Sequence, residues 1–128
     1  MAPDEDVQAA FIRRYVDEFL PAEVDLAGDA ATKDVIEAAV EGEALDIDQG
    51  PTRGRTNDII EAIKLIFESA AFIKTVYEIY KIYRDRNKRG PTLEELIDAV
   101  QNATGRSLSS DKRAITEKVG KQLDDELT

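Results

Sequence analysis

Residues 58–87 read DIIEAIKLIFESAAFIKTVYEIYKIYRDRN, which is 30 residues without a glycine or a proline. Asp58 and Glu61 have the spacing of a capping pair at the start of a helix. Gly90 and Pro91 follow the stretch, and these two residue types commonly come after the end of a helix. The sequence therefore predicts one helix with a length of about 45 Å, at about 1.5 Å per residue.

Large apolar side chains occupy most of the circumference of this predicted helix and leave its charges only a narrow strip. A helix this apolar has to be covered on most sides. Its cover is expected to be the chain's own shorter helices, and a second copy or a partner protein is an alternative that can hold at the same time. A lipid bilayer is disfavoured, because Glu68 and Lys74 would lie near mid-span at a cost of about 2.5 kcal/mol or more each. The large apolar residues are Ile59, Ile60, Ile63, Leu65, Ile66, Phe67, Phe72, Ile73, Val76, Tyr77, Ile79, Tyr80, Ile82 and Tyr83.

Two shorter helices are predicted on the N-terminal side of the long one. The first spans about residues 4–20, where large apolar residues recur every four positions, and Pro21 ends it. Residues 22–28 are small and acidic. The second helix is predicted to start with Thr32 as its cap and to stop at Gly42.

Two more helices are predicted on the C-terminal side. Thr92 and Glu95 have the spacing of a capping box, and apolar residues follow on one face until Gly105 ends the pattern. In the last helix, apolar residues recur at strict intervals of four over residues 115–127. Because such a series drifts around a helix, this segment offers only a narrow contact, and Gly120 weakens it further.

These elements together predict an all-α fold, a compact bundle of about five helices around one long central helix at about residues 58–87. A length of 128 residues and an apolar fraction of 42% fit one folded domain, which is predicted to span residues 1–128. Residues 43–56 contain two glycines and a proline, and they are predicted to form a flexible loop.

The residue types needed for most enzymatic chemistry are missing from the sequence. It has no histidine and no cysteine, which removes the commonest general base, the commonest metal ligand and any thiolate nucleophile. Asp46 and Asp48 have the spacing of the first ligands of a calcium loop, but Pro51 and Asn57 stand where that loop needs glycine and glutamate. Hydrolysis by carboxylates alone would need a cleft that short helices seldom form. We therefore expect no enzymatic activity, no cofactor and no metal.

Charge is unevenly distributed along the chain, whose net charge is −10. Residues 1–50 carry 14 acidic side chains and 3 basic ones, whereas residues 51–90 carry 5 acidic and 9 basic ones. The overall sign repels nucleic acids and anionic membranes, so no nucleic-acid partner is expected and membrane binding is disfavoured. The acidic N-terminal residues also lack the basic start of a signal peptide, which predicts a cytoplasmic protein.

The predicted function is that of a non-catalytic protein–protein interaction module, such as an adaptor, a regulatory subunit or a self-assembling domain. Its partner would be another protein or a second copy of the chain in a homodimer. Aromatic residues are favoured at interfaces, so the predicted binding surface is the apolar, tyrosine-rich part of the central helix. The predicted binding residues are Phe67, Phe72, Tyr77, Tyr80 and Tyr83.

A run of basic residues closes the central helix. Cations are stabilised at the C-terminal end of a helix by its unpaired carbonyls and its dipole, and this is the first interpretation of the run. A charged docking site for an acidic protein surface or for phosphate is the alternative. The residues of the run are Arg84, Arg86, Lys88 and Arg89.

Two other functions stay open at this level. An acidic immunity-type or inhibitor protein would neutralise a basic toxin or nuclease, with the acidic N-terminal part steering the association. A membrane-acting effector would expose the apolar helix after a rearrangement. An inhibitor of the first kind should lose its association rate as salt rises, whereas binding through an apolar face should be nearly insensitive to salt.

Overall fold

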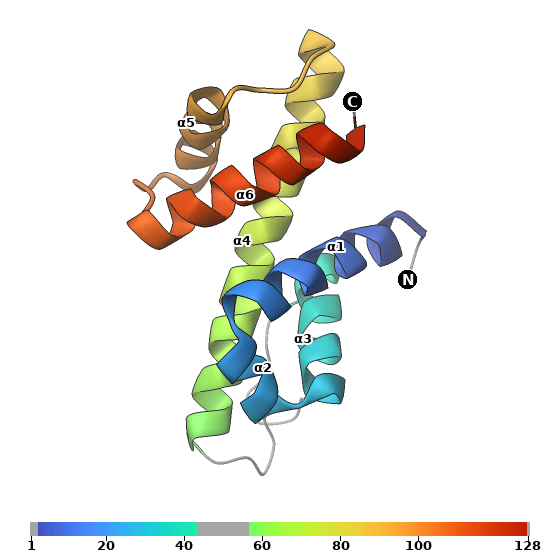
Figure 1. The fold of residues 1–128 in the computed structure, drawn as a ribbon, viewed down its shortest axis with the longest axis vertical. Helices are drawn as coiled ribbons and strands as arrows, with labels where there is room; N and C mark the ends of the chain where they lie inside the picture. The colour runs from blue at the N-terminus through green and yellow to red at the C-terminus, as the bar shows by residue number, and fades with distance from the viewer. Residues whose placement is uncertain (1–2, 44–56, 128) are drawn as a thin grey trace. The chain divides into compact units, whose positions relative to one another are not determined.

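The computed structural model of the protein describes residues 3–43 and 57–127 (Figure 1). Over these residues the chain forms six helices and no strands, which confirms the predicted all-α class and the long helix. The predicted loop at residues 43–56 lies, except for Glu43, outside the described residues, as do Asp46 and Asp48. The helices are α1 (Pro3–Phe19), α2 (Pro21–Ala27), α3 (Asp29–Glu41), α4 (Asn57–Asn87), α5 (Leu93–Thr104) and α6 (Ser110–Leu127).

The helices belong to two compact units, one ending at Lys74 and the other beginning at Thr75. The boundary falls inside α4, so each unit contains part of the long helix. This division does not test the prediction of a single domain over residues 1–128, which stays a prediction.

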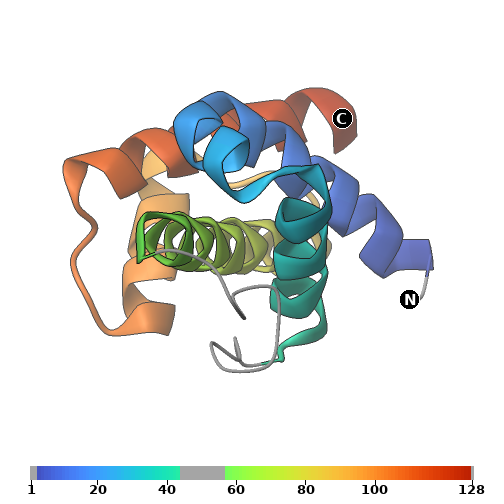
Figure 2. The ribbon, with the colours of Figure 1, turned by 90° about the horizontal axis from the view of Figure 1, so that it is seen from below.

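The first unit contains α1, α2, α3 and the first part of α4. The three short helices pack against one another, and α1 and α3 lie beside this part of α4 (Figures 1 and 2). Val7 starts the predicted four-residue series of α1 but is 61% exposed. A series of fours drifts by about 40° per step on a helix with 3.6 residues per turn, so Val7 lies off the buried face. The side chains that form the centre of this core are Ile12, Val16, Val35, Ile36, Ile63 and Ile66.

Pro21 has a second role that the sequence analysis missed. It ends α1, as predicted, but it also occupies the first position of α2, where a proline loses no hydrogen bond and its fixed φ suits the helix. Residues 22–27 are therefore helical, although no helix was predicted there. The short length of α2 and its mixture of small and acidic residues explain why it shows no clear periodicity.

The start of α3 also differs from the prediction. Gly28, with a φ of +87°, precedes the helix, and Thr32 lies inside its first turn instead of capping it. The Thr32 hydroxyl donates a hydrogen bond to the Gly28 carbonyl oxygen at 2.8 Å, which satisfies a side chain with no exposed surface. The predicted end at Gly42 is confirmed, since Gly42 adopts a left-handed conformation after the last turn.

The second unit contains the last part of α4 together with α5 and α6. The predicted capping box of α5 is confirmed: Glu95 N donates to the Thr92 hydroxyl at 3.2 Å, and Thr92 N donates to a Glu95 carboxylate oxygen at 3.0 Å. The predicted stop at Gly105 is confirmed as well. The core residues of this unit include Val76, Tyr80, Leu96, Val100, Val119 and Leu123.

Most of the apolar surface of α4 is covered, as its composition requires. Leu65, at 40%, and Ile82, at 52%, are its exposed large apolar residues. Across residues 3–43 and 57–127, no helix combines the length and the apolarity needed to cross a bilayer.

Candidate functional site

The five predicted binding residues of α4 do not share one environment. Phe72 and Tyr80 are buried, whereas Phe67, Tyr77 and Tyr83 are half-buried. Phe67 and Phe72 belong to the first unit, and the three tyrosines belong to the second, so the five residues are divided between the two units. The role of these residues in binding stays a prediction.

Tyr80 is a structural link between α4 and α6. Its hydroxyl donates a hydrogen bond to the Asp124 carboxylate, and its ring is fully buried. Burial, and then the hydrogen bond to Asp124, raises the pKa of Tyr80 to about 12. Gly90 passes close over the pair, since a Cβ atom at this position would lie 2.6 Å from an Asp124 carboxylate oxygen. Gly90 is therefore needed for close approach, whereas the left-handed residue after α4 is Lys88, with a φ of +59°.

The basic run at the end of α4 is only partly available for docking. Arg89 is engaged within the second unit: its guanidinium donates to the two Glu95 carboxylate oxygens at 3.1 and 3.2 Å and to the Tyr83 hydroxyl at 2.9 Å. Arg84 is half-buried, and Arg86 and Lys88 are exposed. This placement favours the structural interpretation for Arg89. A charged docking site formed by the run stays a prediction.

The cluster around Glu95 fixes the end of α4 to the start of α5. Glu95 accepts hydrogen bonds from Arg89, Tyr83 and the Thr92 backbone, and these hold the pKa of the Glu95 carboxyl well below its usual range. The hydrogen bond to Glu95 raises the pKa of Tyr83. A lowered carboxyl pKa means that the folded state prefers the charged form, so the stabilisation is present above the ordinary glutamate pKa of about 4.3 and is lost as the pH falls below it.

Replacing Glu95 with glutamine should therefore lower the thermal midpoint of unfolding by a few degrees at pH 7. The difference between the midpoints of wild type and variant should become smaller as the pH falls below about 4.3. Thermal unfolding at a series of pH values between 7 and 3 measures the two midpoints. Glu94→Gln is the matched control, because Glu94 is an exposed neighbour in the same turn, and it should change the midpoint little at any pH. A gap that stays constant down to pH 3 would contradict this role of Glu95.

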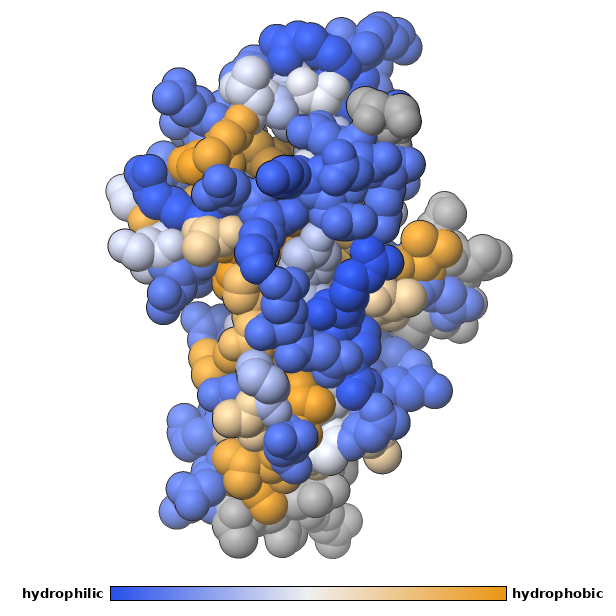
Figure 3. Space-filling model, in the orientation of Figure 1, coloured by the Kyte–Doolittle hydropathy of each residue, from blue (hydrophilic) through white to orange (hydrophobic). Residues whose placement is uncertain are grey.

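Helices α1, α2 and α3 form a strongly acidic part of the first unit. Between Pro3 and Glu41 the chain has 11 acidic side chains and 3 basic ones. One of the three basic side chains, Arg13, forms ion pairs with Asp17 at 3.0 Å and with Asp29 at 2.8 Å. Figure 3 draws one face of the molecule by hydropathy, and hydrophilic residues predominate on it, with hydrophobic residues in separate patches.

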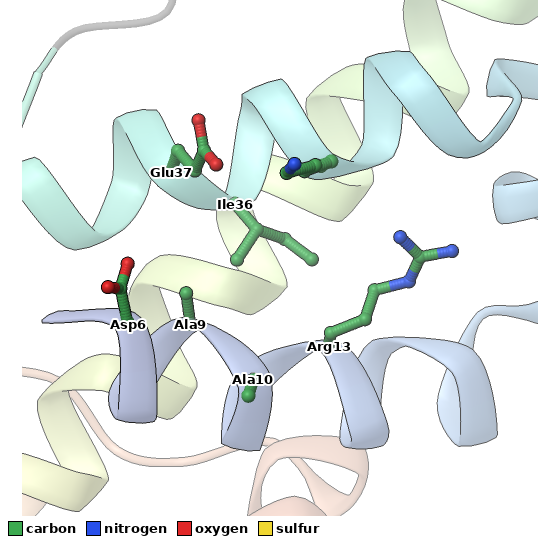
Figure 4. Close-up of a pocket in the computed structure, with 7 residues that line it drawn as sticks. Asp6, Ala9, Ala10, Arg13, Ile36 and Glu37 are labelled. Atoms are coloured by element: carbon green, nitrogen blue, oxygen red, sulfur yellow. The ribbon is translucent and has the colours of Figure 1, made fainter. Parts of the chain in front are cut away.

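A hollow of about 290 Å³ lies between α1 and α3. Figure 4 shows Asp6 and Glu37 at one end, Arg13 at the other, and Ile36 and Ala9 between them. Its floor is apolar and its two ends carry opposite charges. The residues that line it are Asp6, Ala9, Ala10, Arg13, Lys33, Ile36 and Glu37.

This hollow was not found from the sequence. Asp6, Ala9, Ala10 and Arg13 share one side of α1 by helical spacing, and Lys33, Ile36 and Glu37 do the same on α3. Only the packing of the two helices brings these groups together. The sequence therefore indicates which residues share a side of each helix, but it does not indicate that α1 packs against α3.

The acidic face consists of four carboxylates: Asp6 and Glu37, which line the hollow, and Asp34 and Glu41, which lie within about one turn of Glu37 on α3. Asp6, Asp34 and Glu41 are exposed and Glu37 is half-buried. Asp34 and Glu41 lie three before and four after Glu37, so the three occupy neighbouring turns of α3. Within the described part of the chain, none of the four makes an ion pair or a hydrogen bond through its side chain. Lys33 lies one turn before Glu37 but forms no ion pair with any of the four.

A metal-binding arrangement is not formed by these or other carboxylates where the chain is described. No group of three or more acidic, histidine or cysteine side chains there could hold a metal ion. Comparison of the chain with protein-family models, with curated proteins and with solved structures gives no match.

Proposed function

We propose that this chain is a non-catalytic protein-binding module that uses the acidic face of α1 and α3 to bind a basic surface on a partner protein. The observation that carries the proposal is the set of four carboxylates that form no ion pair within residues 3–43 and 57–127, two of which line an open hollow with an apolar floor. The absence of histidine and cysteine from the sequence supports a binding role over a catalytic one.

Electrostatics make a basic partner the preferred one. Charges of one sign on an exposed face raise the rate at which an oppositely charged protein associates, and they exclude partners of the same sign. An inhibitor or immunity-type protein that neutralises a basic toxin or nuclease is the specific form of this activity that the acidic helices favour. A single apolar docking surface on α4 is less favoured, because Phe72 and Tyr80 are buried in the packed chain.

Affinity capture tests the proposal with the wild-type chain and a variant in which the whole acidic face is neutralised, Asp6→Asn, Asp34→Asn, Glu37→Gln and Glu41→Gln. We expect the wild-type chain to retain a basic protein at about 0.05 M salt and to release it towards about 0.5 M, where charges are strongly screened. The variant should retain about tenfold less.

Three results would contradict the proposal. They are capture of no protein at low salt, equal capture by the wild-type chain and the variant, and capture that does not respond to salt. Thermal unfolding of the variant serves as the control for its fold. All four positions are solvent-accessible, so its midpoint should stay within a few degrees of wild type.

A further inference from the structure

The hollow between α1 and α3 has a defined polarity. Arg13 of α1 pairs at 2.8 Å with Asp29 at the start of α3, whereas the earlier residue Asp6 lies at the same end of the hollow as the later residue Glu37, so the two helices run antiparallel (Figure 4). Asp6 lies seven residues before Arg13, or about 10 Å along α1, which places it beside Glu37 farther along α3 (Figure 4). Two carboxylates therefore face the hollow at one end and Arg13 at the other, and Lys33 lies between Asp29 and Glu37 along α3.

The two ends differ in how far their charge is already neutralised. Arg13 is held by Asp17 and Asp29, whereas Lys33 forms no ion pair with the described residues, although it lies one turn from Glu37. At the opposite end, Asp6 and Glu37 have no pairing cation within residues 3–43 and 57–127. A positively charged group is thus attracted to the carboxylate end and repelled by Lys33.

The floor of the hollow suits an aliphatic chain. Ala9, Ala10 and Ile36 form it. A volume of about 290 Å³ is at the lower limit of ligand pockets, which range from about 300 to 1,000 Å³. It therefore suits a single side chain better than a large ligand. Lysine and arginine side chains combine an aliphatic stem with a cationic head, and they bury the stem against apolar surfaces while the head stays among polar groups.

We infer that this hollow receives one lysine or arginine side chain of the partner protein, with the stem on Ala9, Ala10 and Ile36 and the cationic head between Asp6 and Glu37. The inference rests on the proposed function, because it assigns the contact through which the acidic face recognises a basic surface. It adds that recognition depends on the length of the partner's side chain as well as on its charge.

Two synthetic peptides provide the probes. The first is an alanine-based helical peptide with several lysines, and the second carries 2,4-diaminobutyrate at each lysine position, which keeps the charge and removes two methylene groups from each stem. Fluorescence anisotropy at low salt gives the dissociation constants. We expect the wild-type chain to bind the lysine peptide about tenfold more tightly, since each buried methylene contributes about fourfold.

Two double variants locate the contact. Asp6→Asn/Glu37→Gln removes the carboxylates of the hollow, and Asp34→Asn/Glu41→Gln removes the same two types of charge from the neighbouring face of α3. The first variant should weaken binding of the lysine peptide by about tenfold and should lose the preference for the longer stem. The second should weaken it by only about twofold and should keep that preference.

A third variant distinguishes a lost contact from a lost fold, because it is expected to bind more tightly. Lys33→Met removes the cation that lies one turn from Glu37 and repels an incoming positive charge, and it should tighten binding of the lysine peptide by about threefold, which an unfolded protein cannot do. Equal losses in the two double variants, with no preference for the longer stem, would overturn the inference and leave the proposed function standing as general charge attraction. Failure of the wild-type chain to bind the lysine peptide would overturn the inference as well. The proposed function itself fails only when the capture experiment fails.

Discussion

Replacing Tyr80 with alanine is expected to lower the free energy of unfolding by about 3–5 kcal/mol, the range for a buried aromatic side chain. The Tyr80 side chain has no exposed surface, and its hydroxyl is bonded to Asp124 of α6. Alanine would leave a cavity in the second unit and would also remove the donor that Asp124 receives. Urea unfolding followed by circular dichroism measures the loss.

Two further variants separate packing from hydrogen bonding at this position. Tyr80→Phe keeps the ring and removes only the hydroxyl, so a loss of about 1–3 kcal/mol is expected. Tyr77→Ala changes a half-buried tyrosine on the same helix and should destabilise the protein much less than Tyr80→Ala. Equal losses at the two positions would show that Tyr80 is not part of the core.

The protonation of Tyr80 gives an independent measure of the same contact. Its pKa of about 12 lies above the ordinary tyrosine value of about 10, so the folded state prefers the protonated hydroxyl. This stabilisation is complete below about pH 10 and is lost as the pH rises through about 12. Tyrosinate absorbance should show a late-titrating tyrosine that is missing from the Tyr80→Phe variant.

Replacing Gly120 with leucine is expected to destabilise the protein by about 1–3 kcal/mol, because the added side chain has no room between α5 and α6. A Cβ atom at Gly120 would already lie 2.8 Å from Cδ2 of Leu96, a core residue of α5 that is 1% exposed. An alanine in an open helix would gain about 1 kcal/mol over glycine, whereas here the contact with Leu96 opposes that gain. Gly120→Ala should therefore bring little or no stabilisation.

Ala114→Leu is the matched control for Gly120→Leu. Ala114 lies on the exposed side of α6, so the same leucine side chain enters solvent and should change stability by no more than about 0.5 kcal/mol. Denaturant midpoints of the three variants allow the comparison. A clear stabilisation by Gly120→Leu would show that α5 and α6 do not approach closely at this point.

Gly120 has a role in the packing of α6 that its helix propensity does not indicate. By helix propensity alone, a glycine inside a helix predicts a weaker last segment. In the structure Gly120 is buried and permits the close approach of α6 to Leu96, so its low helix propensity is offset by packing. Propensity describes the isolated helix, and the reason for the glycine lies on another helix.

The tyrosines of α4 also differ in ways that only contacts between helices explain. Helical periodicity does not distinguish Tyr77, Tyr80 and Tyr83, because all three are large and lie within two turns of one helix. The structure buries Tyr80 against α6 and ties Tyr83 to Glu95 of α5. The partner of Tyr80 is 44 positions away in the chain. Helical periodicity carries no information about such a distant contact.

Features that depend on neighbours within about four residues were readable from the sequence. The unbroken run in α4, the capping box of Thr92 and Glu95 and the stops at Gly42 and Gly105 belong to this class, because helix formation and capping are decided by i to i+4 hydrogen bonds and local φ and ψ preferences. The hollow, the burial of Tyr80 and the place of Gly120 became visible only when the helices were packed. Each depends on residues of different helices, and the burial of apolar area that brings those helices together is non-directional, so a one-dimensional pattern does not specify which faces meet.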